Sequence, residues 1–439
     1  MAAIAGIFAE NSENDVVKML DLIRYRGRGE IAVDRLPGAT LGIVRNDTQT
    51  HTAGEDKVED RISDHQYAAA GLINGRPFME RDPFGVAPLY YGRRKDGALC
   101  FASEVKSLKA ATDDIREFPA GCRYDGEFLE RYFELREKPP LNEDPALLTA
   151  KLRKRLEKAL QSQIHADEAA CFLSGGLDSS LLAALARRHV KKLRTFAAGV
   201  AGAPDFAPAR MVADFIESEH HEVIVTRDDI LQTLPEIIAH LESFDALLVR
   251  SSIMHYMAAR HIRRYAMEAF SGEGADELFA GYAYLKDLPR GRLAAELITI
   301  TKSLSNTALQ RVDRCGGAFG LRTHIVFLDP EVVDLALQIP IDLKLRDGIE
   351  KWILREAVSD LLPCPVLRRA KVKFWEGAGV QNMLAQYAAS AVTDADFSRE
   401  KKLPNGWELT GKEELLYYRL FRERLGDLEN LDWMGRTAT

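Results

Sequence analysis

The sequence predicts an α/β protein with two domains: a β-rich N-terminal domain and a C-terminal domain built on a parallel sheet with a helical end. Short apolar runs separated by glycine-containing turns fill roughly the first 125 residues, as in a layered or all-β domain. From about residue 145 strand-like and helix-like periods alternate, and beyond about residue 290 the pattern is mostly helical. A chain of 439 residues exceeds one ordinary core, so we expect domains at 1–137 and 146–439.

The N-terminal domain is expected to contain strands at five short apolar runs: residues 2–8, 39–44, 67–73, 86–91 and 99–101. The segment 138–145 contains the adjacent prolines Pro139 and Pro140. It is expected to be a linker, because paired prolines continue neither a helix nor a central strand.

After the linker, the apolar period changes to that of a helix. Apolar residues recur at every fourth position, which predicts an amphipathic helix: Leu148, Leu152, Leu156, Leu160 and Ile164. Strands expected at 169–173 and 193–200 each precede an expected helix, at 179–188 and 207–218. This alternation predicts a parallel sheet wound with helices.

Charge balance and composition exclude several classes of protein. A total of 59 Lys and Arg against 66 Asp and Glu gives a net charge of −7, which does not favour a nucleic-acid partner. No stretch approaches about 18 uninterrupted apolar residues, so we expect no membrane partner. The apolar run 2–9 meets Glu10 without a basic lead and is interpreted as a strand and not a secretion signal. The 5 cysteines lie far apart with no C-x-x-C pair, which predicts reduced thiols in a cytoplasm.

The strongest local signal is the run 174–180, Ser-Gly-Gly-Leu-Asp-Ser-Ser, between an expected strand and an expected helix. Small residues let the backbone approach an anion, and a helix N-terminus presents unpaired N–H groups to it. The hydroxyls of Ser174, Ser179 and Ser180 can donate to phosphate oxygens. Asp178 would repel a phosphate unless it holds Mg²⁺ against it. A capped Gly-Gly turn without a ligand is the simpler alternative, but seven consecutive fitting residues favour a phosphate site.

This run resembles the pyrophosphate-binding loop of the ATP pyrophosphatase family, which cleaves ATP between its α- and β-phosphates. A second run, 271–282, resembles the motif that follows a central strand in asparagine synthetases. Segments 195–199, 219–222, 242–252 and 311–314 also fit, and Lys371 falls on the catalytic lysine of that family. The resemblance covers roughly residues 145–430 and implies an adenine nucleotide α-hydrolase-like domain.

The resemblance implies ATP and Mg²⁺ as cofactors and assigns roles residue by residue. Glu273 and Lys371 are expected to be catalytic, Asp178 and Asp276 to hold the metal, and Arg250, with Glu273, to contact the substrate. The expected nucleotide-binding residues are Leu173, Ser174, Gly175, Gly176, Asp178, Ser179, Ser180, Ala198, Ser271 and Gly272. Lys373 is expected to lie outside this first set of contacts.

The N-terminal domain resembles the class II glutaminase domain of the same family, which implies an Ntn-hydrolase-like α/β/β/α fold. Runs 23–27, 81–91, 101–106 and 118–121 carry the resemblance. A working glutaminase of this kind uses an N-terminal cysteine, whereas this chain begins Met1-Ala2-Ala3-Ile4 and its first cysteine is Cys100. The stretch between Gly75 and Arg81 is also short. We therefore expect a degenerate domain that does not hydrolyse glutamine.

Three positions depart from the asparagine synthetase pattern. In the run 322–329, Arg322 stands in place of a glutamate and His324 in place of an arginine, and Leu247 replaces a hydroxyl residue. These changes put aspartate in doubt as the substrate. Compensating surface drift is the alternative explanation.

Together these features imply a cytoplasmic ligase that adenylates a small-molecule carboxylate and transfers the acyl group to ammonia or an amine. A specialised biosynthetic carboxylate is the favoured substrate, and a homodimer is left open. Ring closure of an amino acid, as in β-lactam synthetases, is the second hypothesis, although those enzymes carry tyrosine where this chain has Glu273. A catalytically inactive scaffold is the third, and it must explain why four costly charged residues are retained: Asp178, Glu273, Asp276 and Lys371.

Overall fold

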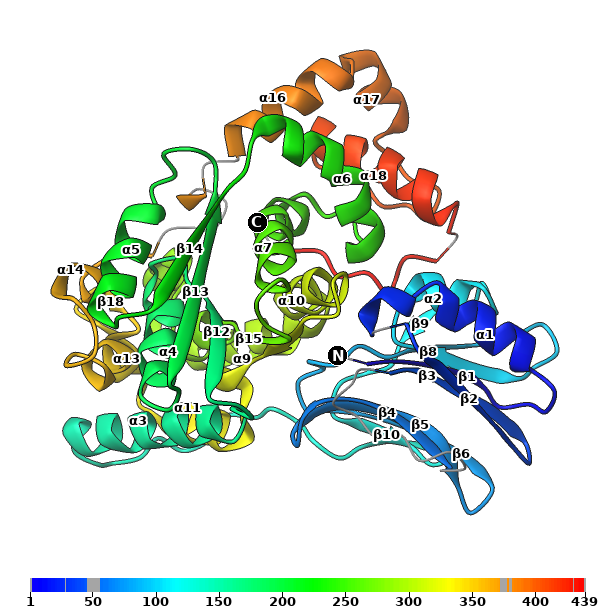
Figure 1. Ribbon diagram of the computed structural model, residues 1–439, viewed down its shortest axis with the longest axis horizontal. Coiled ribbons are helices and arrows are strands. Elements are labelled where there is room, and N and C mark those ends of the chain that lie inside the picture. Colours follow the sequence, from blue (N-terminus) through cyan, green and yellow to red (C-terminus); the bar gives the residue numbers. More distant parts are fainter. Residues whose placement is uncertain are drawn as a thin grey trace.

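The computed structural model describes residues 2–27, 29–45, 56–371, 377–378, 381–428 and 430–437. Figure 1 shows an N-terminal unit (residues 2–131, blue to cyan) beside a C-terminal unit (residues 145–437, cyan-green to red). Residues 132–144 join the two units without helix or strand. The next helix already begins at Pro145, the last residue of the expected linker, with Asp144 as its N-cap.

Two antiparallel sheets form the N-terminal unit, ordered β2-β3-β1-β8-β7-β9 and β11-β10-β6-β5-β4. Their strands are β1 (Ala3–Ile7), β2 (Ile31–Leu36), β3 (Ala39–Val44), β4 (Lys57–Ser63), β5 (Gln66–Ile73), β6 (Arg76–Arg81), β7 (Tyr90–Arg93), β8 (Leu99–Ala102), β9 (Arg116–Glu117), β10 (Cys122–Tyr124) and β11 (Leu129–Arg131). The helical segments of this unit are α1 (Glu13–Asp21), η1 (Arg24–Arg26) and α2 (Val105–Lys109).

Strand β1 is apolar throughout because both of its faces are buried. Successive side chains of a strand point to opposite faces. Ile4 packs in a core cluster with Met79 of the other sheet, whereas Ala5 and Ile7 pack in a cluster with Leu20 of α1. The unbroken apolar run at the start of the chain therefore marks a strand buried between a sheet and a helix.

Helices cover one sheet of the N-terminal unit. Both α1 and α2 pack on the six-stranded sheet. Within the described residues of this unit no helix covers the five-stranded sheet, so the expected α/β/β/α arrangement has three of its four layers. Strands β5 and β6 are joined directly by a tight turn in which Asn74 has φ +51° and Gly75 has φ +74°. The short stretch before Arg81 leaves no chain for a further helix there.

One strand prediction in this unit is wrong in its bounds. The run 86–91 forms a strand only from Tyr90, where β7 begins. Its first half is a turn in which the Asp82 carboxylate accepts the N–H groups of Phe84, Val86 and Ala87 at 3.0–3.1 Å. A buried carboxylate that collects backbone donors holds this apolar segment out of the sheet.

A parallel sheet ordered β14-β13-β12-β15-β16 is the centre of the C-terminal unit. Its strands are β12 (Glu168–Phe172), β13 (Lys192–Gly199), β14 (Glu219–Ile224), β15 (Glu268–Phe270) and β16 (Arg322–His324), and β17 (Leu345–Arg346) and β18 (Ile349–Glu350) form a separate hairpin. The predicted parallel sheet is confirmed, and the strands expected at 169–173 and 193–200 are β12 and β13.

Helices lie on both faces of this sheet, as Figure 1 shows, with α4 and α5 on one side and α7 on the other. The helices are α3 (Pro145–Gln161), α4 (Leu177–Arg187), α5 (Phe206–Phe215), α6 (Arg227–Leu241), α7 (Ala246–Ile262), α8 (Ala275–Leu278), α9 (Arg290–Lys302), α10 (Ala308–Gly317), α11 (Pro330–Gln338), α12 (Ile341–Lys344), α13 (Trp352–Ala357), α14 (Cys364–Leu367), α16 (Gln381–Ala391), α17 (Asp394–Glu400) and α18 (Lys412–Leu425), with short turns η2 (Ala283–Asp287), η3 (Ser303–Asn306) and η4 (Val326–Leu328). The helical character expected beyond residue 290 is confirmed.

Across the part of the chain that the structure describes, no helix combines the length and apolarity needed to cross a membrane. All 5 cysteines are free thiols, and four of them are buried while Cys364 is exposed.

Candidate active site

The two glycine-containing runs lie next to each other because they follow neighbouring strands. The run 174–180 follows β12 and the run 271–282 follows β15, and these strands are adjacent in the sheet. The strand order runs outward from this pair in both directions, which makes it the point where the topology switches. Ligands of open parallel sheets bind outside the carboxyl ends of the strands at such a point.

The first loop has the backbone shape of an anion-binding turn. Gly175 has φ +69°, and a Cβ there would lie 2.4 Å from the backbone nitrogen of Ala209, so this position requires glycine. The Ser174 N–H donates to Ser179 Oγ at 3.2 Å, and the Gly176 N–H donates to Ser174 Oγ at 3.3 Å. Helix α4 begins directly after this turn, so the partial positive charge of its N-terminus faces the loop.

Three of the expected nucleotide contacts lie in or near this wall of the site. Leu173 and Ser180 are buried, at 1% and 0% exposure, beneath the loop. Ala198 lies in β13, where it pairs with Val223 of β14. A direct hydroxyl contact from Ser180 to a phosphate is therefore harder to form than one from Ser174 or Ser179.

The second loop touches the first. A Cβ on Gly272 would lie 3.0 Å from the Cβ of Asp178 and 3.2 Å from the Ser179 nitrogen. Ser271 continues β15, since its N–H donates to the His324 oxygen of β16 at 3.1 Å. The close approach of backbone to backbone explains the small residues at this end of both loops.

Four charged side chains meet where the loops converge, and we call them the carboxylate–lysine cluster: Asp178, Asp276, Lys351 and Lys371. Lys351 Nζ lies 2.6 Å from Asp178 Oδ2 and 2.5 Å from Asp276 Oδ1. Lys371 Nζ lies 2.6 Å from Asp276 Oδ2 and 3.8 Å from Asp178 Oδ2. The structure thus brings together the two aspartates and the lysine that the sequence singled out, and adds Lys351.

The two lysines determine how this buried cluster is charged. Burial acts to raise the pKa of Asp276, but the ammonium groups of Lys351 and Lys371 lower it far below its usual range. Burial raises the pKa of Asp178, and the charge of Asp276 adds to the effect. Burial acts to lower the pKa of Lys371, but Asp276 and Asp178 raise it. Lys371 therefore stays a cation, and its side chain is 34% exposed at the edge of the cluster.

The donor set fits a magnesium ion that is shared with a nucleotide. Mg²⁺ is commonly held by one or two carboxylates together with substrate phosphates, and Asp178 and Asp276 share the Nζ of Lys351, so their oxygens are close. Among the described residues no group of three or more His, Cys, Asp and Glu side chains could hold a metal alone. The phosphates are thus required to complete such a site.

Glu273 lies on the same loop but has a different partner. Its Oε1 is 2.6 Å from Arg311 Nη2 of α10, and both side chains are largely buried. Directly after Asp276, the buried Glu277 accepts the hydroxyl of Tyr282. Burial and the charge of Asp276 raise the pKa of Glu277 to about 7. The site therefore holds one carboxylate paired with a guanidinium and one that retains a proton near neutral pH.

The segment that carries Lys371 is anchored by its backbone. Glu350 Oε1 accepts the Lys371 N–H at 3.2 Å and pairs with Arg355 at 2.8 Å. Arg369 pairs with Asp205 at 2.5 Å and donates to the Ser174 oxygen at 3.4 Å. These contacts tie the lysine segment to the first loop. The expected position of Lys373 lies outside the described residues.

Sequence reasoning missed Lys351, Arg311 and Glu350. Lys351 precedes α13 in a left-handed conformation, with φ +54°, and no glycine run or charged motif surrounds it. Arg311 lies in the run 311–314, which resembled the family, but its partner Glu273 is 38 residues away. The match of the run 311–314 was a signal for Arg311, whereas Lys351 and Glu350 lie in no matching run. The contacts of all three residues arise from the fold.

Arg250 is placed differently from the substrate-binding role expected of it. Its Nε and Nη2 lie 2.6 and 2.5 Å from the carboxylate of Glu413 on α18, and Tyr417 donates to the same carboxylate at 2.8 Å. Among the described contacts none joins Arg250 to the carboxylate–lysine cluster. A substrate carboxylate would have to displace Glu413, so the role of Arg250 stays a prediction.

The two departures in β16 have a structural partner. Arg322 Nη1 lies 2.6 Å and His324 Nε2 lies 3.1 Å from the carboxylate of Glu268, the first residue of β15. The second loop, 271–282, begins at the opposite end of that short strand. The contacts support compensation within the sheet over a change of substrate, and they leave only the half-buried Leu247 of the three departures unexplained.

Replacing Glu268 with glutamine is expected to reduce stability in a pH-dependent way. Burial acts to raise the pKa of Glu268, but the hydrogen bond with His324 outweighs this effect and lowers the pKa to about 2. The value in an unfolded chain is near 4.5. Its contribution is thus present above about pH 4.5 and is lost as the pH falls towards 2. Burial lowers the pKa of His324, so at pH 7 Glu268 faces a neutral imidazole and the guanidinium of Arg322. Guanidinium unfolding at pH 7 should show a loss of roughly 1–3 kcal/mol for Glu268→Gln. The difference from the wild type should shrink at pH 3, and a difference independent of pH would contradict this account.

Comparison with known proteins assigns both units of the chain to known families. The asparagine synthase family matches residues 151–306 and 289–434, and the glutamine amidotransferase domain family matches residues 48–143. A probable glutamine-hydrolyzing asparagine synthetase of Dictyostelium discoideum is 32% identical over 408 residues, which is 84% of this chain and 73% of that protein. Asparagine synthetase 2 of Arabidopsis thaliana is 33% identical over 374 residues, 78% of this chain and 64% of the relative. Asparagine synthetase B of Escherichia coli is 32% identical over 368 residues, which is 78% of this chain and 66% of that protein.

Among solved structures, NMN synthetase from Francisella tularensis aligns with a TM-score of 0.30 at 15% identity, over 66% of this chain and 98% of that chain. The chain spans about two thirds of the length of the curated relatives that it matches. The two family models and the curated relatives define the class of protein, an ATP-dependent carbon–nitrogen ligase with an amidotransferase-type N-terminal domain. The chain belongs to the asparagine synthetase family.

Proposed function

We propose that this protein activates a substrate carboxylate as an acyl-adenylate and transfers the acyl group to ammonia or an amine, without hydrolysing glutamine. The observation that carries this proposal is the carboxylate–lysine cluster beside the loop 174–180, at the switch point of the parallel sheet. A carboxylate and an amine do not condense at useful rates in water, so activation by a nucleotide is needed.

Each charged group has a role in the first half-reaction. The substrate carboxylate attacks the α-phosphate, and pyrophosphate leaves towards the turn formed by Ser174, Gly175 and Gly176. The ammonium groups of Lys351 and Lys371 face the negative charge that develops there, and fixed cations in a desolvated site stabilise such charge strongly. Asp178 and Asp276 would hold Mg²⁺, which supplies further neutralisation of the phosphates when bound.

The second half-reaction places a proton acceptor on the neighbouring loop. The amine attacks the activated carbonyl carbon and must lose a proton, for which Glu273 is the candidate acceptor. Arg311 holds the Glu273 carboxylate at 2.6 Å and so fixes its orientation. AMP then leaves, and the amide bond is complete.

The N-terminal unit supports the proposed lack of glutamine hydrolysis. Its cysteines are Cys100 and Cys122, and both are buried. The Cys100 thiol donates to the Gly92 oxygen at 3.3 Å, and burial raises its pKa to about 12. A thiol with that pKa is not a nucleophile near neutral pH. The relatives named above are described as glutamine-hydrolyzing, so the proposed loss of this activity would separate the present chain from them.

Exchange of labelled pyrophosphate into ATP, measured with MgCl2, tests the first half-reaction. L-aspartate is tried first as the substrate acid, and a metabolite extract then supplies other acids. Mass spectrometry of the products, with ammonium chloride or with glutamine, tests the second. We expect an amide with ammonium and none with glutamine. Asp178→Asn is the control, because it keeps the shape of the side chain and removes its charge.

Other outcomes of this experiment overturn particular parts of the proposal. Amide formation from glutamine as efficient as from ammonium contradicts the loss of glutaminase activity. A product that is lighter by one water without added ammonium indicates ring closure instead. Turnover of L-aspartate as good as that of any acid in the extract would exclude a specialised carboxylate. Absence of exchange with every acid would favour the scaffold hypothesis.

A further inference from the structure

A buried group of charges joins the N-terminal unit to helix α10, and we call it the interdomain charge cluster: Arg26, Asp60, Glu104, Glu242, Asp313 and Arg314. The two Nη atoms of Arg26 lie 2.8 Å from the two carboxylate oxygens of Asp313, and Nη1 lies 2.9 Å from Glu104. Arg314 of the same helix pairs with Glu242 at 3.0 Å. None of the six side chains is more than 4% exposed.

The interdomain charge cluster fixes the position of α10 relative to the N-terminal unit more than it increases the stability of the protein. Desolvation of buried charges is costly, and their attraction offsets it only when the geometry is close to ideal. The paired contact between Arg26 and Asp313 has this geometry, with two nitrogen–oxygen distances of 2.8 Å. A small displacement of α10 relative to the N-terminal unit would break it, so the helix is held in one place.

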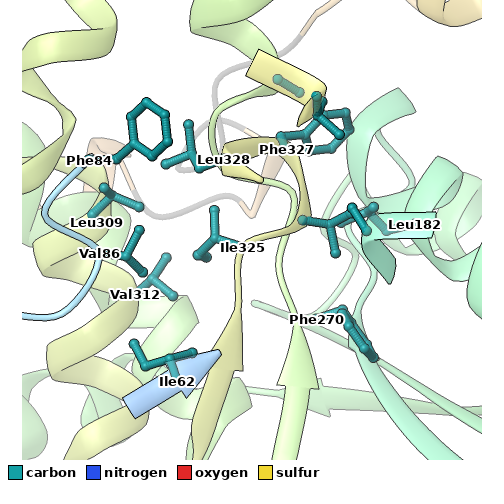
Figure 2. Packing of buried hydrophobic residues seen from close by; sticks show 14 of the residues in the cluster. Ile62, Phe84, Val86, Leu182, Phe270, Leu309, Val312, Ile325, Phe327 and Leu328 are labelled. Carbon is teal, nitrogen blue, oxygen red and sulfur yellow. The ribbon is translucent and has the colours of Figure 1, made fainter. Parts of the chain in front are cut away.

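Apolar packing holds the same helix from the same side. The turn after Asp82 presents Phe84 and Val86 to α10, and Figure 2 shows them beside Leu309 and Val312. A Cβ on Gly85 would lie 2.8 Å from the Cβ of Ser305, just before α10 begins. The N-terminal unit thus meets α10 with both charged and apolar contacts.

The opposite face of α10 meets the candidate active site. Arg311 and Asp313 are two residues apart and thus point about 200° apart around the helix. Asp313 contacts Arg26 of the N-terminal unit, and Arg311 contacts Glu273 at 2.6 Å. One rigid helix therefore connects the interdomain charge cluster to the proposed proton acceptor.

We propose that the N-terminal unit serves the ligase reaction as a positioning element: through α10 it sets the place of Arg311 and hence of Glu273. This inference rests on the proposed function of Glu273. It gives the unit a function that requires no glutamine, and it makes Arg26 and Asp313 positioning residues for acyl transfer. Neither residue contacts the carboxylate–lysine cluster among the described contacts, so adenylation should depend on them less than transfer does.

The test uses two single variants of the full chain, Arg26→Met and Asp313→Asn. Each is assayed with ATP, MgCl2, ammonium chloride and either L-aspartate or an acid that supports exchange in the experiment described above. Amide formation should fall at least about 10-fold relative to ATP–pyrophosphate exchange, since a displacement of about 1 Å at a catalytic group can cost roughly 100-fold. The KM for ATP should stay within about twofold of the wild type, because the nucleotide contacts lie on the other side of α10. Asp313→Asn keeps the side-chain shape and guards against a variant that fails to fold.

Arg94→Met is the control inside the N-terminal unit. Arg94 pairs with Asp15 of α1 at 3.2 Å, and among the described contacts none joins it to α10. This variant should keep the ratio of amide formation to exchange at the wild-type value. The inference is overturned if Arg26→Met and Asp313→Asn also keep that ratio, or if they leave amide formation unchanged. A wild type without exchange activity would instead overturn the proposed function itself.

Discussion

Lys351→Met is expected to lower ATP–pyrophosphate exchange by about 10²–10³-fold, the loss typical of removing one fixed donor from a desolvated site. Lys351 is 2% exposed and contacts both aspartates of the carboxylate–lysine cluster, so it lies where the charge of the leaving pyrophosphate must be met. Its removal also leaves two buried carboxylates facing each other with Lys371 alone. Breaking a buried pair from one side costs roughly 3–5 kcal/mol, so the melting temperature should fall as well.

Lys344→Met is the control for this variant. Lys344 is also buried, at 4% exposure, seven residues before Lys351, and burial lowers its pKa to about 7. Because it already loses its charge easily, methionine should leave both stability and exchange close to the wild type. Exchange in Lys351→Met within about threefold of Lys344→Met would show that the lysine is structural only.

Glu273→Gln is expected to separate the two half-reactions. Amide formation should fall by about 10²–10⁴-fold, the range for loss of a general base, while ATP–pyrophosphate exchange should be retained. The separation follows from the contacts, because Glu273 pairs with Arg311 and the two aspartates pair with the lysines. Rapid-quench measurement of the acyl-adenylate should show it accumulating in this variant.

Glu277→Gln provides the comparison on the same loop. The pKa of Glu277 is raised to about 7, so this side chain is largely protonated in mildly acidic solution, and glutamine mimics that form. Both half-reactions should therefore persist in Glu277→Gln at pH 6. Equal losses of exchange and transfer in Glu273→Gln would place Glu273 in the nucleotide site and refute its role as proton acceptor.

Much of the fold can be predicted from patterns of residues that are close together in the sequence. The four-residue spacing from Leu148 to Leu160 matches the buried face of α3, and the strand–loop–helix order around residues 168–187 matches β12 and α4. These features depend on residues close in sequence. The strand expected at 86–91 begins only at Tyr90, because the buried Asp82 carboxylate accepts the N–H groups of Phe84 and Val86. Apolar periodicity does not reveal such hydrogen bonds.

The candidate site divides in the same way. The loops, and the nearness of Asp178 to Asp276, follow from glycine runs placed after two strands, since the carboxyl ends of adjacent parallel strands share an edge. The partners of Arg250, Arg322 and His324 did not follow from the sequence. Each is paired with a carboxylate from a distant or neighbouring element, Glu413 or Glu268, and such a pairing exists only once the elements pack.

By itself, then, the sequence determined the parallel-sheet architecture, the two anion-adapted loops and the kinship with amide-forming ligases, because these properties reside in short contiguous runs. Only the tertiary structure decided that Lys351 bridges the two aspartates and that Arg311 holds Glu273. It also decided that α10 is clamped between the N-terminal unit and the site. These are contacts between charges far apart along the chain, and a charge acquires its partner from packing and not from its neighbours in sequence.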